Sequence, residues 1–185
     1  AVAMILAKQR LDDDTIITAL LHDTIEDTKS TYHEVEKQFG TEVAQLVDGV
    51  TKLTNLELSS KDNKQAENFR KLLLAMSKDV RVILVKLSDR LHNMRTIRHM
   101  FSEKQERKAV ETMDIYAPLA GRMGMQWMRE ELEDLSFRVL NPEARNSIMR
   151  RFLTLRKETG DVTPQITQDI RDVLAKAGIE ATVLG

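Results

Sequence analysis

The chain has 185 residues, of which 42% are hydrophobic and 31% charged, a composition typical of a folded protein with a real core and atypical of a disordered chain. With only 7 Gly, 3 Pro and 4% aromatic residues, a sandwich or barrel rich in tight turns is disfavoured, and an all-α fold is predicted. A net charge of −1 argues against direct nucleic-acid binding through bulk charge, and the absence of Cys fits a reducing, cytoplasmic compartment.

The opening sequence, AVAMILAKQR, lacks an initiator Met and any leader pattern, so we expect a fragment whose true start lies upstream. No uninterrupted apolar run approaches the ~20 residues that a membrane helix needs, and no membrane association is expected.

Capping residues and hydrophobic periodicity predict a succession of helices. These cover residues 13–27, 31–40, 41–53, about 65–76, 80–97, 102–117, 126–140, 141–160 and 163–177. The supporting signals include first-turn acids and capping boxes, at Asp12 to Asp14, Thr31 with Glu34, and Ser102 with Gln105.

Three other segments carry separate expectations. Residues 80–97 begin apolar on every face, which is typical of a central buried helix. The polar stretch 54–64 predicts a loop, and Pro118 is expected to kink or break the helix before it. The final IEATVL alternates like a strand without a partner, so a second domain is expected to follow.

One group of polar residues would be electrostatically unfavourable in an isolated helix. If residues 13–27 form one helix, the spacing places His22, Asp23, Glu26 and Asp27 on one side of it. Three carboxylates near a helix C-terminus oppose the helix dipole, and like charges ~4 Å apart repel by about 4 kcal/mol at an effective dielectric of 20. A positive partner is therefore expected beside them.

A second group lies in the apolar segment 80–97. Asp89, Asn93 and Thr96 share one stripe, and Asp89 interrupts a run of Val, Ile and Leu. A buried carboxylate is unfavourable unless it is paired or bound to a cation. Either Lys86 or Arg90 could simply be its partner.

One arrangement satisfies both groups: the two helices pack side by side and share a divalent metal. His22, Asp23 and Asp89 are then the candidate ligands, and Glu26 and Asp27 form an acid pair near them. Nitrogen and carboxylate ligands suit Mn²⁺, Fe²⁺ or Zn²⁺, and the pattern does not choose among these. Such a metal activates water and neutralises charge on a phosphoryl group.

The remaining histidines favour simpler interpretations. His33 and His99 do not sit with other ligand types and are predicted to lie at the surface. His92 points about a quarter-turn from Asn93, and packing or solvent contact is expected for it.

Several motifs together resemble the hydrolase domain of the bacterial RelA/SpoT homologue family. They are LLHDTIEDT, FGTEVAQLVDGVTKL, AENFRKLLLAM, VRVILVKLSDRLHNMRTI and EKQERKAVETMDIYAPLAGRMG, and they span about residues 1–140. The resemblance implies an all-helical HD-type phosphohydrolase that uses Mn²⁺ to remove pyrophosphate from the 3′ position of the guanosine tetra- and pentaphosphates ppGpp and pppGpp.

The resemblance also implies a role for each matching residue. The metal ligands are His22, Asp23 and Asp89, the catalytic acids are Glu26 and Asp27, and the substrate-binding residues are Asn93 and Thr96. A further metal-binding His and basic substrate contacts would lie upstream of Ala1, so weak metal affinity and low activity are expected of the chain alone. Gly121 stands where many members carry His, which we expect to affect a helix junction more than chemistry.

The domain organisation follows from the same resemblance. Residues 1–140 match the hydrolase domain, and 141–185 match a helical connector that leads toward a synthetase domain of the same parent chain. Two other functions stay open: a catalytically silent module that regulates the synthetase, and an HD hydrolase of another nucleotide phosphate.

Overall fold

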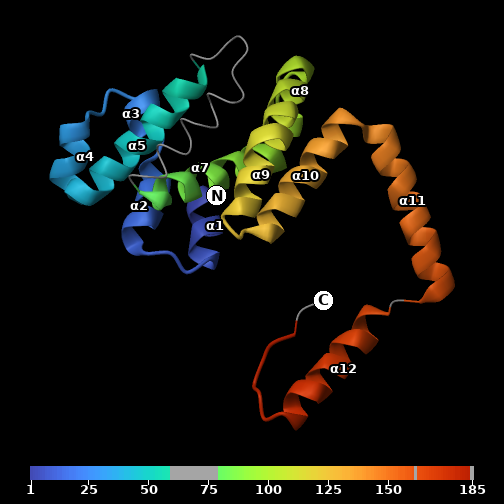
Figure 1. Cartoon of the computed structure of the whole chain (residues 1–185). Coiled ribbons are helices and arrows are strands. Elements are labelled where there is room, and N and C mark those ends of the chain that lie inside the picture. The colour runs from blue at the N-terminus through green and yellow to red at the C-terminus, as the bar shows by residue number, and fades with distance from the viewer. Residues whose placement is uncertain (59–78, 161, 184–185) are drawn as a thin grey trace. The chain divides into compact units, whose positions relative to one another are not determined.

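The computed structural model describes residues 1–58, 79–160 and 162–183, and these residues form helices and no strands (Figure 1). The predicted all-α fold class is confirmed. The expected helix at about 65–76 and the part of the expected loop at 59–64 lie outside the described residues. The chain divides into two compact units, Ala1–Leu140 and Asn141–Gly185.

The described helices of the first unit are α1 (Val2–Lys8), α2 (Asp13–Leu21), α3 (Thr24–Asp27), α4 (Tyr32–Phe39), α5 (Thr41–Leu58), α7 (Val80–Arg95), the 3₁₀ turn η1 (Ile97–His99), α8 (Ser102–Glu111), the π-helical segment η2 (Thr112–Tyr116), α9 (Ala117–Arg122) and α10 (Gln126–Leu140). Those of the second unit are α11 (Pro142–Thr159) and α12 (Thr163–Lys176). No described helix combines the length and the apolar character needed to cross a bilayer.

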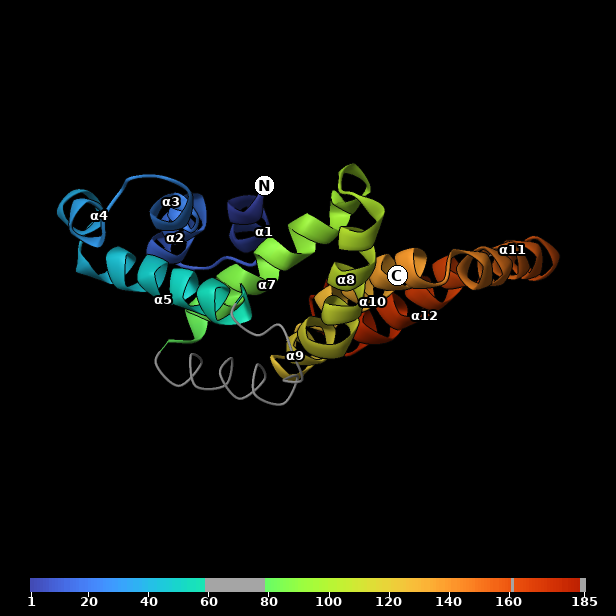
Figure 2. The ribbon, with the colours of Figure 1, turned by 90° about the horizontal axis from the view of Figure 1, so that it is seen from above.

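Helix α7 is the centre of the first unit, as its apolar sequence predicts. It contacts α1, α2, α5 and α10, and Figure 2 shows it running between these helices. Its buried apolar side chains are Val82, Ile83, Val85, Leu87, Leu91 and Met94. Each such burial stabilises the fold by roughly 1.5–3 kcal/mol. The helix is capped at its start by Asp79, whose carboxylate accepts a hydrogen bond from Arg81 N at 2.9 Å.

A second, smaller core lies where α4 and α5 meet the α2–α3 segment. Its buried members are Val35, Val43, Ala44 and Val47, and its partly buried neighbours are Ile17, Leu21, Ile25 and Tyr32. The Thr31/Glu34 capping box at the start of α4 is confirmed. Gly40 ends α4 with a φ of +90°, a conformation that favours glycine. This core fixes α2 and α3 against α5.

The predicted start of a loop at Thr54 and one predicted capping box are wrong. Helix α5 continues to Leu58 through the stretch expected to be a loop, because tertiary contacts of Leu53 and Thr54 outweigh the polar composition. The Ser102/Gln105 capping box does not form: Phe101 is the N-cap without a side-chain bond, and Gln105 Nε2 donates instead to Met100 O at 2.7 Å.

The helical path does not break at Pro118. It passes from α8 through η2 into α9, and Pro118 lies in the first turn of α9. Proline cannot donate a backbone hydrogen bond, and the π-helical turn just before it accommodates the missing bond without ending the helix. The expected irregularity is therefore a π-helical segment rather than a chain break.

In the second unit, the helix starts at Asn141–Pro142 and near Pro164 agree with the predictions. The strand-like interpretation of the end is wrong for the described residues 179–183, which form no strand. No strand pairs with this segment in the described chain; Val183 O instead accepts a hydrogen bond from Arg171 Nη2 at 3.1 Å. Both helices expose apolar side chains at helical spacing, namely Ile148, Phe152 and Leu155 on α11 and Ile166, Ile170 and Val173 on α12.

Candidate metal centre and catalytic site

The single helix predicted over 13–27 is wrong, because the chain breaks at the candidate ligands. Helix α2 ends at Leu21 and the short α3 begins at Thr24. The Thr24 hydroxyl donates to Leu21 O at 2.5 Å, so a side chain takes the place of the next backbone hydrogen bond. His22 and Asp23 consequently occupy the turn between two helices.

This break also corrects the expected electrostatics of the acid pair. Glu26 and Asp27 lie in the first turn of α3, whose N-terminal end favours carboxylates, rather than at the C-terminus of a long helix. Both side chains are exposed. Asp27 is close enough to Asp23 for its charge to raise the pKa of the Asp23 carboxyl.

The turn brings His22 and Asp23 against α7, where Asp89 faces them. His22 Nε2 lies 3.0 Å from Asp23 Oδ2 and 3.6 Å from Asp89 Oδ1. The side chains of His22 and Asp89 are only 13% and 16% exposed, whereas that of Asp23 is 54% exposed. The two sequence groups therefore meet at a site that is closed on one side and open to solvent on the other.

The orientation of the His22 ring fixes its tautomer. Nδ1 lies 3.0 Å from Ala19 O, and because a carbonyl only accepts, Nδ1 carries the proton. In the neutral ring Nε2 then presents its lone pair toward two carboxylates. This atom is buried and makes no hydrogen bond of acceptable geometry among the described residues. A lone pair facing two anionic groups is stabilised by a proton or a cation placed between them.

The charges around His22 and Asp89 favour the ionised form of both side chains. Burial alone would lower the pKa of His22, but the Asp89 carboxylate and the charge of Asp23 outweigh it, so the pKa is raised. For Asp89 burial would raise the pKa, but His22 and the charges of Lys86 and Arg90 outweigh it, so the pKa is lowered. The Asp23 pKa is raised, first by burial. The protein thus favours a positive charge at the His22–Asp89 contact.

Asp89 has two further partners on its own helix. Asn93 Nδ2 donates to Asp89 Oδ1 at 2.9 Å, and Lys86 Nζ lies 3.8 Å from Asp89 Oδ2. Lys86 is itself buried and donates to the hydroxyl of Thr54 on α5 at 3.0 Å. The contribution of Thr54 was not predicted, because the residue falls in the segment expected to be a loop.

Arg90, the other possible partner of Asp89, turns away from the site. Its guanidinium forms an ion pair with Glu111 at 2.8 Å and lies 4.0 Å from the centroid of the Tyr116 ring. The side chain is 4% exposed. It therefore joins α7 to α8 and η2 behind the site.

The last candidate residue, Thr96, is the C-cap of α7. Its hydroxyl donates to the carbonyls of His92 at 3.0 Å and Asn93 at 3.3 Å. The hydroxyl proton is therefore directed to backbone acceptors, and the oxygen keeps lone pairs with which it can accept a hydrogen bond. The surface positions predicted for His33 and His99 are confirmed.

The chemistry of His22, Asp23 and Asp89 fits a divalent cation. A metal-binding His usually donates its other ring N–H to a carbonyl or carboxylate, as His22 does to Ala19. Ligand atoms about 2.1 Å from one ion are themselves separated by about 3.0–3.4 Å, close to the two distances at Nε2. In the described chain, no three His, Asp or Glu side chains are already arranged around one metal position. The two oxygens of Asp89 are instead contacted by Asn93 and Lys86.

The HD domain family model matches residues 1–126, and the chain belongs to this family. Its all-helical fold is thus that of an HD domain.

Curated relatives align over nearly the whole chain. The "GTP pyrophosphokinase rsh" of Brucella suis is 56% identical over 182 residues, which is 98% of this chain and 24% of the relative. The "Guanosine-3′,5′-bis(diphosphate) 3′-pyrophosphohydrolase" of Haemophilus influenzae is 44% identical over 185 residues, 100% of this chain and 27% of the relative. The "Bifunctional (p)ppGpp synthase/hydrolase SpoT" of Escherichia coli is 46% identical over 185 residues, 100% and 26%. The resemblance to RelA/SpoT homologues is confirmed, and the chain spans about a quarter of the length of these relatives.

Proposed function

We propose that this chain is a metal-dependent hydrolase that removes pyrophosphate from the 3′ position of ppGpp and pppGpp. The observation that carries the proposal is the buried His22 Nε2, held by its ring orientation between the carboxylates of Asp23 and Asp89. The names of the Haemophilus influenzae and Escherichia coli relatives specify the same substrate class, and the HD family supplies the reaction class.

His22, Asp23 and Asp89 would hold the cation, for which we propose Mn²⁺. When bound, such a cation supplies Lewis-acid stabilisation of the charge that develops on phosphoryl oxygens. The raised pKa of His22 means that a proton competes for the same lone pair. Metal binding should therefore release a proton from His22 when the pH is below that pKa.

Glu26 and Asp27 are proposed to orient the attacking water and accept its proton. They are exposed, as groups that must meet water and substrate need to be, and α3 places them one turn after the ligand Asp23. Water adds to the phosphorus attached to the ribose, and the bond between that phosphorus and the 3′ oxygen breaks. The 3′ oxygen takes up a proton and becomes the hydroxyl of GDP or GTP, and pyrophosphate is released.

The substrate would extend along α7 from Asp89. Asn93 already aligns its amide with Asp89, and the Thr96 oxygen can accept a hydrogen bond from a ribose hydroxyl. Lys86 places a buried positive charge beside the ligand Asp89 and can offset phosphate charge. Catalysis by this site would be mainly electrostatic and positional.

The proposal is tested by measuring hydrolysis of ppGpp with Mn²⁺ present, beside NADPH and deoxynucleoside triphosphates under the same conditions. The proposal is supported if, of these compounds, only ppGpp is hydrolysed. If another nucleotide is hydrolysed faster, that nucleotide and not ppGpp is the substrate. Because the family resemblance places a further metal-binding His upstream of Ala1, the same assay is made on a chain that begins earlier. We expect tighter Mn²⁺ binding and higher turnover from the longer chain.

A catalytically silent regulatory module is the second candidate function. The presence of both Glu26 and Asp27, exposed on α3 just after the His22–Asp23 turn, favours catalysis over this alternative. Metal binding without turnover by the longer chain would favour the silent module.

We propose that residues 141–185 connect the hydrolase to a synthetase domain of the same parent chain. The apolar side chains exposed on α11 and α12 are suited to packing against further protein. Because the proposed substrate is a nucleotide of the cell interior, we place the activity in the cytoplasm.

A further inference from the structure

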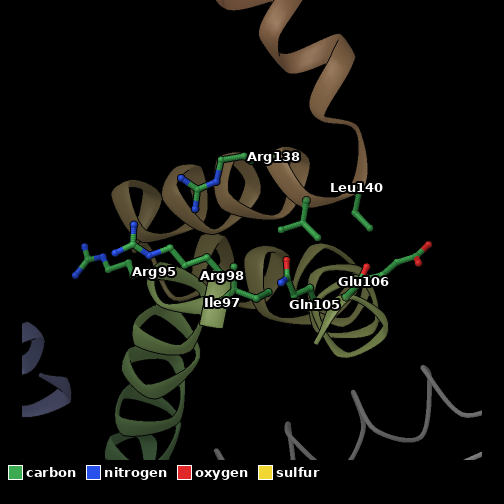
Figure 3. Close-up of a pocket in the computed structure, with 9 residues that line it drawn as sticks. Arg95, Ile97, Arg98, Gln105, Glu106, Arg138 and Leu140 are labelled. Atoms are coloured by element: carbon green, nitrogen blue, oxygen red, sulfur yellow. The ribbon is translucent and has the colours of Figure 1, made fainter. Parts of the chain in front are cut away.

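A pocket of about 700 Å³ lies at the far end of α7, apart from the candidate metal centre. Its lining comes from the end of α7, η1, the start of α8 and the end of α10 (Figure 3). Asp89 and Arg95 are both on α7, and six helical steps separate them by about 9 Å along the axis and by about 120° around it. The pocket therefore opens in a different direction from the metal centre.

Three arginines line this pocket, and Figure 3 shows their guanidinium groups gathered at one end of it. Arg95 forms a bidentate ion pair with Glu131, with both distances 2.6 Å. In the described part of the chain, neither Arg98 nor Arg138 pairs with a carboxylate; Arg98 Nε donates only to His99 Nε2, at 3.3 Å. Two guanidinium groups are thus available to an anion.

The helices that line the pocket are held together without a ligand. The Arg95–Glu131 pair joins α7 directly to α10, so the segments that carry Arg98 and Arg138 are held together. A site organised in advance loses less conformational freedom when it binds a ligand. One acidic residue, Glu106, lies at the opposite end of the pocket in Figure 3.

The rest of the lining includes an apolar wall of Ile97, Val139 and Leu140. Paired guanidinium groups match the oxygens of a diphosphate, and a guanidinium can also stack on a flat base. The volume lies within the range of small-molecule sites and exceeds what a bare diphosphate needs.

We propose that this pocket binds a nucleoside diphosphate, with the diphosphate on Arg98 and Arg138 and the nucleoside against the apolar wall. The pocket shares none of the residues proposed to bind the metal or the hydrolase substrate, and the proposal needs no metal.

The test titrates GDP and, separately, inorganic pyrophosphate into the whole chain by isothermal calorimetry in EDTA, which prevents binding through a metal. The variant is Arg98→Gln with Arg138→Gln. The matched control is Arg150→Gln with Arg151→Gln on α11, which removes the same charge elsewhere. Circular dichroism checks that both variants are folded.

We expect GDP to bind more tightly than pyrophosphate, and the Arg98/Arg138 variant to weaken GDP binding at least tenfold while the control changes it less than twofold. The variant Arg98→Lys with Arg138→Lys should bind GDP more tightly than the Gln variant but less tightly than the unmodified chain, because the charge returns without the bidentate geometry. Equal weakening in both Gln variants, equal affinity for the two probes, or no GDP binding at about 1 mM overturns the proposal.

Discussion

His22 and Asp89 come from distant parts of the chain, yet their side chains meet with Nε2 3.6 Å from Oδ1. Without a compensating charge, both residues would be unfavourable where they lie. The Asp89 carboxylate would be buried in an apolar helix, and the Nε2 lone pair of His22 would face two anionic groups. Together with a proton or a cation they compensate each other. The contact therefore explains why the polar residues of both segments are tolerated.

Replacing Asp89 by Asn should weaken Mn²⁺ binding by at least about a hundredfold, because the amide keeps the shape but removes a charged ligand. The affinity is measured by calorimetry at pH 7.5. Asp48→Asn is the matched control, because Asp48 is an acid on α5 that pairs with the exposed Lys52. Wild-type affinity in the Asp89 variant would remove this residue from the metal centre.

Replacing Glu26 by Gln and Asp27 by Asn should lower turnover of ppGpp by about 10²–10⁴-fold, the usual contribution of a positioned acid or base. Mn²⁺ affinity should change little, because neither residue is a proposed ligand. Glu158→Gln on α11 is the control for loss of an exposed carboxylate. Retained turnover in the double variant would exclude the pair from the mechanism.

Two glycines in helices respond differently to the same change. A Cβ on Gly49 of α5 would lie 2.9 Å from Val82 Cγ2, and a Cβ on Gly121 of α9 would lie 2.9 Å from Arg129 Cδ. Val82 is stiff and buried, whereas the Arg129 side chain is flexible and 44% exposed. Only the second neighbour can move away easily.

Gly49→Ala should therefore destabilise the chain, because overpacking of about 1–3 kcal/mol exceeds the gain in helix propensity of up to about 1 kcal/mol. Gly121→Ala should be neutral or stabilising by up to about 1 kcal/mol. Urea unfolding at pH 7 measures both free energies. Adding Val82→Ala should reduce the penalty of Gly49→Ala, and a penalty independent of position 82 would contradict the packing argument.

Asp12, the N-cap of α2, makes the stability of the fold depend on pH. Its carboxylate accepts hydrogen bonds from the Thr15 hydroxyl at 2.7 Å and the Thr15 N–H at 3.1 Å, and Arg81 lies 3.3 Å away. The Thr15 hydroxyl is the main reason that the pKa of Asp12 is lowered below its ordinary value, and the charge of Arg81 contributes. The carboxylate therefore stabilises the fold above about pH 4, and this stabilisation is lost as the pH falls through the lowered pKa.

Asp12→Ala should accordingly lower the free energy of unfolding by about 0.5–2 kcal/mol at pH 7, the usual effect of losing an N-cap. The difference from the unmodified chain should shrink as the pH is lowered below 3.8. Denaturant unfolding at a series of pH values measures it. A difference that stays constant down to pH 2 would show that the charge of Asp12 has no part in the cap.

The central helix could be predicted because it depends on regular apolar spacing. The meeting of the two polar groups could be predicted because each group needs an opposite charge or a cation, although His22 and Asp23 lie in a turn and not on the helix face that their spacing indicated. An apolar run with one Asp indicates a buried helix with a partnered carboxylate, and α7 has both. The break at Thr24 could not be predicted, because competition between a hydroxyl and a backbone N–H for Leu21 O is decided by tertiary packing. The choice of Lys86 over Arg90 as the neighbour of Asp89 depends on Glu111, whose position is set by the path of α8.

The π-helical segment η2 determines what surrounds Arg90. Residues five apart in a regular α-helix point about 140° away from each other, so Glu111 and Tyr116 would not reach the same group. A wider turn, in which hydrogen bonds connect residues five apart, brings such positions onto nearly the same side. Deleting one residue from η2 would therefore convert it to a regular α-helical turn. Arg90 would then lose its contact with either Glu111 or the Tyr116 ring, and a buried positive charge would lose a compensating contact behind the proposed reaction centre.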